Sequence, residues 1–484
     1  MDFRIAFIGA GSIGFTRKLI RDILSVPEFD SISIALMDIN RDNLAMVESL
    51  VRRDIAANGK TGVHLIATTD RRKALEGARY VFSVARIGGL EAFSTDIEIP
   101  LKYGIDQCVG DTLCAGGIMY GQRNIPFILD VCKDIREVAS ADPLFLNYAN
   151  PMAMNTWAAN RYGGVRTVGL CHGVQHGHEQ IADALGLKRE DVDIVCAGIN
   201  HQTWYIQIRH RGEDLTGKLL SAFENHPVYR EQEKVRIDML RRFGYYSTES
   251  NGHLSEYLPW YRKRPEEITR WIDLSDWIHG ETGGYLRHCT EQRDWFVTEF
   301  AQLESEPALT YSQQERSLEH GSYILEGLET GRTYRGHFNV VNGGAISNLP
   351  QDAIVEVPGY VDGNGMSIPV VGELPLGPAA ICSASISVQR LAVEAAVRGD
   401  DALLRQAMMM DPLVGAVCNP PEIWQLVDEL LVAQKAWLPQ YAAAISDAER
   451  RLADGPRIPT RTSAGAARLE RRSVEELRTA KEQQ

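Results

Sequence analysis

The chain has 484 residues, of which 44% are hydrophobic and 24% charged, so it is long enough for two or three domains with cores of their own. Its formal net charge of −13 argues against a nucleic-acid or anionic-membrane partner, because phosphate binding requires a basic surface. Eight scattered cysteines without a C-x-x-C pair are typical of reduced cytoplasmic thiols rather than of a disulfide framework.

The first 170 residues alternate between short apolar runs and helical segments. Because the first run starts at residue 3, without a signal-peptide pattern, and no uninterrupted apolar run reaches about 18 residues, we expect a cytoplasmic protein without a membrane span. Six strands are predicted: Arg4–Ile8, Ser31–Met37, Val63–Ala67, Tyr80–Val84, Leu144–Asn147 and Thr167–Leu170. The helices between them include Ile13–Leu24, Arg41–Ala57 and Ile125–Val138. This pattern predicts an α/β fold with a doubly wound parallel sheet of the Rossmann type, like that of lactate and malate dehydrogenases.

Beyond about residue 195 the pattern changes to a mixture of helices and strands. The predicted elements are helices at Tyr229–Phe243, Glu291–Leu303, Val388–Arg398 and Pro421–Ala436, and a β section within 336–372. Residues 447–484, rich in Ala, Arg and Glu, predict a solvated helix or a loose tail. We therefore expect a Rossmann domain (1–195), a mixed α+β domain for substrate and metal (196–440) and a helical or flexible tail (441–484).

A glycine-rich turn between the first strand and the first helix predicts a dinucleotide site. Gly9 allows the tight turn, Gly11 with Ser12 lets the backbone approach a pyrophosphate, and Gly14 would let the helix pack closely on the sheet. The phosphates would face the N-terminus of the helix. Asp38 follows the second strand, where its carboxylate can accept a hydrogen bond from a ribose hydroxyl. The same carboxylate would repel a 2′-phosphate, so NAD is favoured over NADP.

Further polar residues follow later strands and point to a second site at the same edge of the sheet. Asp111, Asn150 and Cys171 are expected at the carboxyl edge, where ligands bind in an open parallel sheet. Cys171 and His201 offer a thiol and an imidazole, which are good ligands for a borderline transition metal. Each residue alone would more often be structural, so the prediction depends on their shared location.

From about residue 3 to about residue 440 the chain resembles glycoside hydrolase family 4, the NAD- and divalent-metal-dependent glycosidases, and most closely its melibiase-type α-galactosidases. The resemblance is carried by ordered blocks: Gly9-Ala10-Gly11-Ser12, Asp111-Thr112, Asn147-Tyr148-Ala149-Asn150-Pro151-Met152, Gly169-Leu170-Cys171-His172-Gly173-Val174-Gln175, Gly198-Ile199-Asn200-His201, Gly244-Tyr245-Tyr246-Ser247-Thr248-Glu249-Ser250, Asn348-Leu349-Pro350 and Met409-Met410-Asp411-Pro412.

The resemblance implies a role for several of these residues. Cys171 and His201 would hold a divalent metal, Mn²⁺ or another divalent ion, and Asn150 would contact sugar hydroxyls. Tyr257 resembles the tyrosine that removes a proton from the sugar, although Tyr261 or Glu256 could also fill that role. The acid that assists the leaving group stays open between two residues of this chain, His172 and Asp111.

By the same resemblance, catalysis is a transient oxidation at C3 of the sugar, followed by removal of the C2 proton and elimination of the aglycone. NAD-dependent glycosidases are an exception to the usual pair of carboxylates. Phe93 stands where phosphosugar-hydrolysing members carry an arginine, so we expect an unphosphorylated glycoside. The resemblance also suggests a homodimer or homotetramer.

Two departures from the melibiase pattern leave the sugar open. Gly173 replaces the usual serine, as in the α-glucuronidase branch, and Ser250-Asn251-Gly252-His253 replaces Ser-Ser-Glu-His, which removes a carboxylate. An α-galactoside is the first expectation, and a uronide, through an α-glucuronidase or α-galacturonidase activity, is the alternative. A 2-hydroxy acid dehydrogenase and a non-catalytic NAD sensor share the first domain, but neither needs the Cys171/His201 pair.

Overall fold

The computed structural model describes residues 1–461 and 464–482. Its centre is a 12-stranded sheet in the order β3-β2-β1-β4-β5-β6-β10-β11-β7-β8-β9, with β12 paired to β11. The strands are β1 (Arg4–Ile8), β2 (Ser33–Met37), β3 (His64–Thr68), β4 (Tyr80–Ser83), β5 (Leu144–Asn147), β6 (Thr167–Gly169), β7 (Asp193–Ile199), β8 (Gln202–His210), β9 (Glu213–Asp214), β10 (Tyr334–Val341), β11 (Ile354–Asp362) and β12 (Gly365–Ser367).

The first six strands confirm the predicted Rossmann sheet. They are parallel and follow the order 3-2-1-4-5-6. The predicted strand ends differ from the observed ones by at most two residues. The sheet then continues through antiparallel strands, because β10 pairs with β6 and β11 pairs with both β10 and β7. The proposed domain boundary at residue 195 lies inside β7, so the two sides share one sheet and the division stays a prediction.

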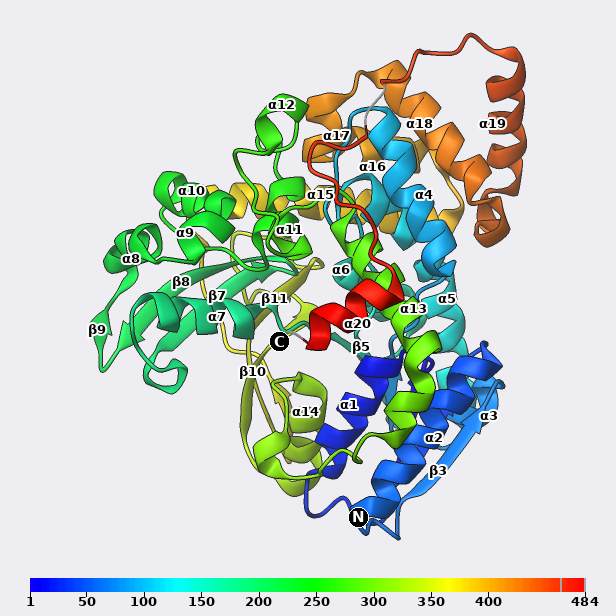
Figure 1. Cartoon of the computed structure of the whole chain (residues 1–484), viewed down its shortest axis with the longest axis vertical. Helices are drawn as coiled ribbons and strands as arrows, with labels where there is room; N and C mark the ends of the chain where they lie inside the picture. The colour runs from blue at the N-terminus through cyan, green and yellow to red at the C-terminus, as the bar shows by residue number, and fades with distance from the viewer. Residues whose placement is uncertain (462–463, 483–484) are drawn as a thin grey trace.

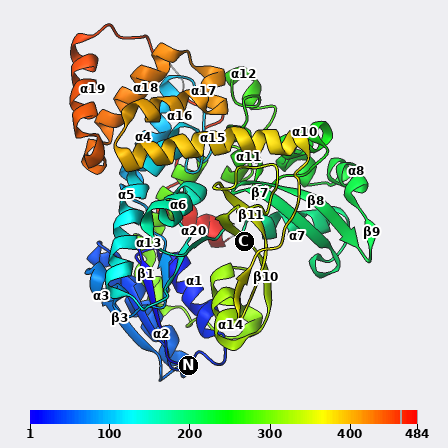
Figure 2. The same cartoon turned by 180° about the vertical axis from the view of Figure 1, so that it is seen from behind.

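Helices cover the sheet and build a separate layer beyond its carboxyl edge (Figures 1 and 2). They are α1 (Ile13–Leu24), α2 (Arg41–Ala57), α3 (Arg71–Leu75), α4 (Gly89–Lys102), α5 (Cys114–Val138), α6 (Met152–Ala158), α7 (Gly173–Ala184), α8 (Leu219–Asn225), α9 (Tyr229–Gln232), α10 (Lys234–Phe243), α11 (Asn251–Tyr257), α12 (Pro265–Ile268), α13 (Gly284–Ser305), α14 (His320–Thr330), α15 (Leu376–Arg398), α16 (Asp401–Met410), α17 (Pro412–Val417), α18 (Pro420–Ala433), α19 (Ala442–Asp454) and α20 (Val474–Glu482). Among the described residues, α15 is the helix long and apolar enough to cross a bilayer, yet half of its apolar window is buried in the protein.

Helix α5 is longer than the predicted Ile125–Val138 and begins directly after the loop that carries Asp111. Its first turns contain Gly116 and Gly117, which disfavour a helix by propensity. A Cβ atom on Gly116 would lie 2.4 Å from the carbonyl oxygen of Gly110, and one on Gly117 would lie 2.4 Å from the backbone of Thr112. The glycines therefore let the loop that carries Asp111 pack directly against the start of α5.

One further expectation is wrong, and one of the two alternatives for the C-terminal segment is met. The predicted helix Tyr229–Phe243 is interrupted at Glu233, whose buried carboxylate accepts from Gln180 and pairs with Arg236 at 3.0 Å. The described part of the C-terminal segment is helical in α19 and α20, but it is not a loose tail, because Arg472 pairs with Glu291 at 2.9 Å and residues 466–467 bond to the protein body. Residues 462–463 and 483–484 of the predicted tail lie outside the described residues.

Candidate active site

A cavity of about 670 Å³ runs along the carboxyl edge of the parallel strands. Gly9, Ser12 and Asp38 line it at the end of β1 and β2, and Cys171, His201 and Glu249 line it beyond β6. The predicted nucleotide site and the predicted metal site are therefore two parts of one cavity. A volume of this size is within the usual range for a cofactor or ligand pocket.

The nucleotide end is built by close contacts between three loops. Gly9 has a φ of +88°, and a Cβ atom on it would lie 2.7 Å from the backbone of Ala85. The amide of Gly11 donates to Asp38 Oδ2 at 2.8 Å, and the amide of Asn40 donates to Asp38 Oδ1 at 2.8 Å. Asp38 thus holds the glycine turn and also faces the cavity. The expected packing role of Gly14 is wrong, because Gly14 is exposed and a Cβ atom there would meet nothing within 4 Å.

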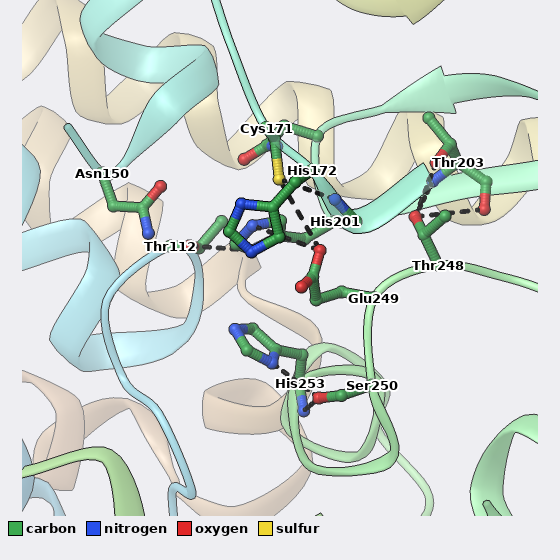
Figure 3. Close-up of polar contacts among 12 residues, drawn as sticks. Thr112, Asn150, Cys171, His172, His201, Thr203, Thr248, Glu249, Ser250 and His253 are labelled. Carbon is green, nitrogen blue, oxygen red and sulfur yellow. Dashed lines mark hydrogen bonds and ion pairs between the residues drawn. The ribbon is translucent and has the colours of Figure 1, made fainter. Parts of the chain in front are cut away.

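The metal end brings together a thiol, an imidazole and a carboxylate (Figure 3). The Cys171 Sγ and His201 Nε2 atoms lie 3.6 Å and 3.8 Å from Glu249 Oε2. His201 occupies the two-residue turn between β7 and β8 with a φ of 64°, a left-handed conformation that costs a non-glycine residue roughly 1–2 kcal/mol. Strain of this kind is found most often at functional positions.

Burial and neighbouring charges act in opposite directions on these ligand candidates. Burial and the nearby Glu249 raise the pKa of the Cys171 thiol well above its ordinary value. Burial also raises the pKa of Glu249, but the surrounding histidines, His201 first, outweigh it and lower that pKa to about 2. A bound cation favours the thiolate and the carboxylate, so this donor set fits a divalent transition metal.

The space between the two ends is lined by polar groups that can position a sugar. Asn150 Nδ2 donates to Asp111 Oδ2 at 2.9 Å, and Arg86 Nη2 lies 3.6 Å from the same oxygen. The Arg86 guanidinium also stands over the rings of Phe93, at 4.5 Å, and Tyr120, at 4.8 Å. Its Nη1 atom is buried and has no hydrogen-bond partner. Phe93 is fully buried beneath Arg86 and offers no cation to a phosphate.

Comparison with known families shows to which family the chain belongs. The model of the Family 4 glycosyl hydrolase matches residues 4–187, and the model of the Family 4 glycosyl hydrolase C-terminal domain matches residues 196–414. The chain belongs to glycosyl hydrolase family 4. The N-terminal Rossmann sheet and the following mixed α+β region of this family 4 enzyme are the fold expected from its sequence.

Several family 4 relatives match nearly the whole chain. An alpha-galactosidase from Rhizobium meliloti is 62% identical and is matched over 99% of this chain and 98% of its own length. An alpha-galactosidase from Bacillus subtilis is 34% identical and is matched over 90% of this chain and 99% of its own length. An alpha-galacturonidase from Bacillus subtilis is 29% identical, with 85% and 93% covered.

Two solved structures have the same fold. A 6-phospho-alpha-glucosidase from gut microorganisms, in complex with NAD and glucose-6-phosphate, has a TM-score of 0.74 and is 25% identical, with 91% of this chain and 99% of that chain covered. A 6-phospho-alpha-glucosidase in complex with NAD and Mn²⁺ has a TM-score of 0.76 at 20% identity, with 91% and 99% covered.

Two of the residues predicted for proton transfer, His172 and Tyr257, occupy different positions in the family 4 site. His172 is 43% exposed, lines the cavity and pairs through Nδ1 with Glu319 at 3.1 Å. Burial lowers its pKa, but Glu319, with Glu249 and Glu356, outweighs burial and raises it to about 9. The Tyr257 hydroxyl is buried behind His201, 3.2 Å from Nδ1, and its role as base stays a prediction.

The two alternative bases are engaged elsewhere. The Glu256 carboxylate accepts the backbone amides of Cys108, Val109 and Gly110, and so holds the loop that leads to Asp111. The Tyr261 hydroxyl donates to a buried carboxylate on α10, Asp238, at 3.0 Å. Both side chains are therefore committed to structural contacts.

The cavity residues to which the sequence analysis assigned no role include Glu249, His253 and Arg86. His253 shares a hydrogen bond between its Nδ1 atom and Ser250 Oγ, 2.7 Å away, and its ring packs edge-to-face with that of His201, with the centroids 4.8 Å apart. Glu249 and His253 lie within or next to one of the sequence blocks that carry the family resemblance. Their distance from Cys171 along the chain does not indicate that they come close to it in the fold. Only the fold brings the start of α11 against the ends of β6 and β7.

Proposed function

We propose that this family 4 glycosyl hydrolase cleaves unphosphorylated α-galactosides and uses NAD and a divalent metal as cofactors. Mn²⁺ is the first candidate for this metal. The observation that carries the proposal is that the glycine turn with Asp38 and the Cys171/His201/Glu249 cluster line one cavity. The 62% identity to an alpha-galactosidase supports the choice of sugar. The match of both halves to family 4 leaves the 2-hydroxy acid dehydrogenase and the NAD sensor without support.

The proposed cofactors fit the residues present. The turn at Gly9 and Gly11, beside the N-terminus of α1, would hold the pyrophosphate of NAD, and Cys171 and His201 would hold the metal. When bound, NAD⁺ supplies reversible removal of hydride from C3 of the sugar, and the metal supplies a Lewis acid for the C2 and C3 oxygens.

The remaining steps are assigned to side chains of the chain. Asn150 and Asp111 orient the sugar hydroxyls, since they are joined by a 2.9 Å hydrogen bond on the cavity wall. Tyr257, once its hydroxyl turns from His201 Nδ1 towards the cavity, takes the proton from C2, and His172, held by Glu319, donates a proton to the glycosidic oxygen as the C1–O bond breaks. Water then adds at C1 and a proton returns to C2, which completes the hydrolysis. In this account Asp111 positions the substrate, because its carboxylate already accepts from Asn150 and Thr112.

The test is hydrolysis of p-nitrophenyl α-D-galactoside by protein freed of nucleotide and metal, with NAD⁺, Mn²⁺ and thiol restored together and each omitted in turn. We expect turnover only when NAD⁺ and Mn²⁺ are both present. Activity that survives removal of both would overturn the cofactor requirement. Faster hydrolysis of the 6-phosphate of the same galactoside would overturn the preference for an unphosphorylated sugar.

A uronide is the second candidate, because a specific observation favours it. Arg86 lines the cavity together with Asn150, its buried Nη1 atom has no hydrogen-bond partner, and its guanidinium could pair with a sugar carboxylate. An alpha-galacturonidase is among the relatives, at 29% identity. A higher kcat/KM for p-nitrophenyl α-D-galacturonide than for the galactoside would replace the first candidate with this one. The cytoplasmic location and a dimeric or tetrameric assembly stay predictions.

A further inference from the structure

The carboxylate of Glu249 occupies a notch that only a glycine at position 173 leaves open. Gly173 is buried at the start of α7, two residues after Cys171. A Cβ atom on Gly173 would lie 1.8 Å from Glu249 Oε2, and its three nearest heavy atoms all belong to the Glu249 carboxyl group. The φ of Gly173 is not positive, so alanine suits its backbone and the carboxylate is what a side chain would displace.

The same oxygen that fills the notch faces the two residues expected to hold the metal. Glu249 Oε2 lies 3.6 Å from Cys171 Sγ and 3.8 Å from His201 Nε2. Ligand atoms bound to one ion at about 2.2 Å lie roughly 3.1–3.6 Å apart in octahedral or tetrahedral geometry. The observed spacing therefore needs only a small contraction to surround a common cation.

The burial of Glu249 also calls for a positive partner. Its side chain is 9% exposed, and a buried carboxylate is normally paired with a cation or bound to a metal. In the described part of the chain, the ion-pair contact of this carboxylate is with His201, which is itself an expected metal ligand. A divalent ion at this position would neutralise the thiolate and the carboxylate together.

We infer that Glu249 is a third protein ligand of the metal, and that Gly173 is the positioning residue that admits its carboxylate beside Cys171 and His201. This inference rests on the proposed function only in requiring that the cavity binds a divalent ion. It extends the expected two-residue ligand set to three and gives a structural reason for glycine, rather than serine, after His172. Any side chain at position 173 must move the carboxylate away.

The test measures Mn²⁺ binding to the full-length protein by titration calorimetry and by the loss of the free-ion electron paramagnetic resonance signal. Three variants are compared with the parent: Glu249→Gln, Gly173→Ala and the double variant. We expect each single change to raise the Kd for Mn²⁺ at least about tenfold, as loss of a ligand or its support does. The double variant should be no weaker than Glu249→Gln alone, since both changes remove the same contact.

Gly217→Ala is the matched control, because Gly217 lies away from the cavity, lacks a positive φ and has nothing within 4 Å of its Cβ position. It should leave the Kd within about twofold, and circular dichroism should show all variants folded. If the Kd of Glu249→Gln for Mn²⁺ stayed within about threefold of the parent value, the inference would be overturned. It would also be overturned if the two single changes raised the Kd independently, so that their effects multiplied in the double variant. Absence of Mn²⁺ binding by the parent protein would overturn both proposals, whereas tight binding unaffected by either change would overturn this one alone.

Discussion

Alanine substitutions at Gly9, in the glycine-rich turn, and at Gly14, in the first turn of α1, should have opposite effects on stability. At Gly9 the φ of +88° costs an alanine roughly 1–2 kcal/mol, and its Cβ atom would overlap the Ala85 backbone at 2.7 Å. Because backbone cannot swing aside as a side chain does, that overlap costs a further ~1–3 kcal/mol. Gly9→Ala should therefore destabilise the protein by about 2–5 kcal/mol. Gly14→Ala lies in a helix with open space around it and should gain up to ~1 kcal/mol.

Urea unfolding measures this difference directly, because the midpoint reports stability when the slope is unchanged. NAD⁺ binding by calorimetry should weaken in Gly9→Ala as well, since the displaced turn carries the amide of Gly11. Free energies of unfolding that agree within about 0.5 kcal/mol for Gly9→Ala and Gly14→Ala would show that the first glycine is no more constrained by conformation and contact than the third.

Three further changes probe the base, the cofactor and a buried ion pair. Tyr257→Phe should lower kcat at least ~100-fold while Mn²⁺ binding stays within threefold; near-normal turnover would move the base to another group. Asp38→Ala removes the acceptor of the Gly11 amide and should raise the Kd of NAD⁺ more than that of NADP⁺, and an unchanged ratio would contradict its role. Asp428 is held by two arginines; burial raises its pKa, but these arginines lower it below the ordinary value overall. The stability that this ion pair contributes is present above pH 4 and is lost as the pH falls through the pKa of Asp428 in the folded protein. The free energy of unfolding of Asp428→Asn, ~1–3 kcal/mol below that of the parent at pH 7, should therefore approach the parent value towards pH 3.5. A difference that stays constant with pH would contradict this role of Asp428.

The parallel half of the sheet was predictable because all of its strands except the edge strand β3 are buried on both faces and read as continuous apolar runs. The continuation of the sheet was not, since β6 pairs with β10 about 170 residues later along the chain and local pattern carries no sign of such a partner. The first turns of α5 were missed for a different reason. Gly116 and Gly117 lower helix propensity, and the close packing that compensates for it is tertiary.

The candidate site divides in the same way. Cys171, His201, Asn150 and Asp111 could be placed from the sequence because they follow strands or turns and meet at one edge of the sheet. Glu249 comes from a segment with no such landmark, and its carboxylate reaches the site only because Gly173 leaves room for it.

In the proposed mechanism the glycosidic bond breaks after a proton leaves C2 of the sugar. Hydrolysis of p-nitrophenyl α-D-galactoside in D₂O, with NAD⁺ and Mn²⁺ present, tests this directly by nuclear magnetic resonance of the released galactose. We expect deuterium at C2 of the product in proportion to turnover. Product that forms at the same rate and keeps its original hydrogen at C2 would contradict it.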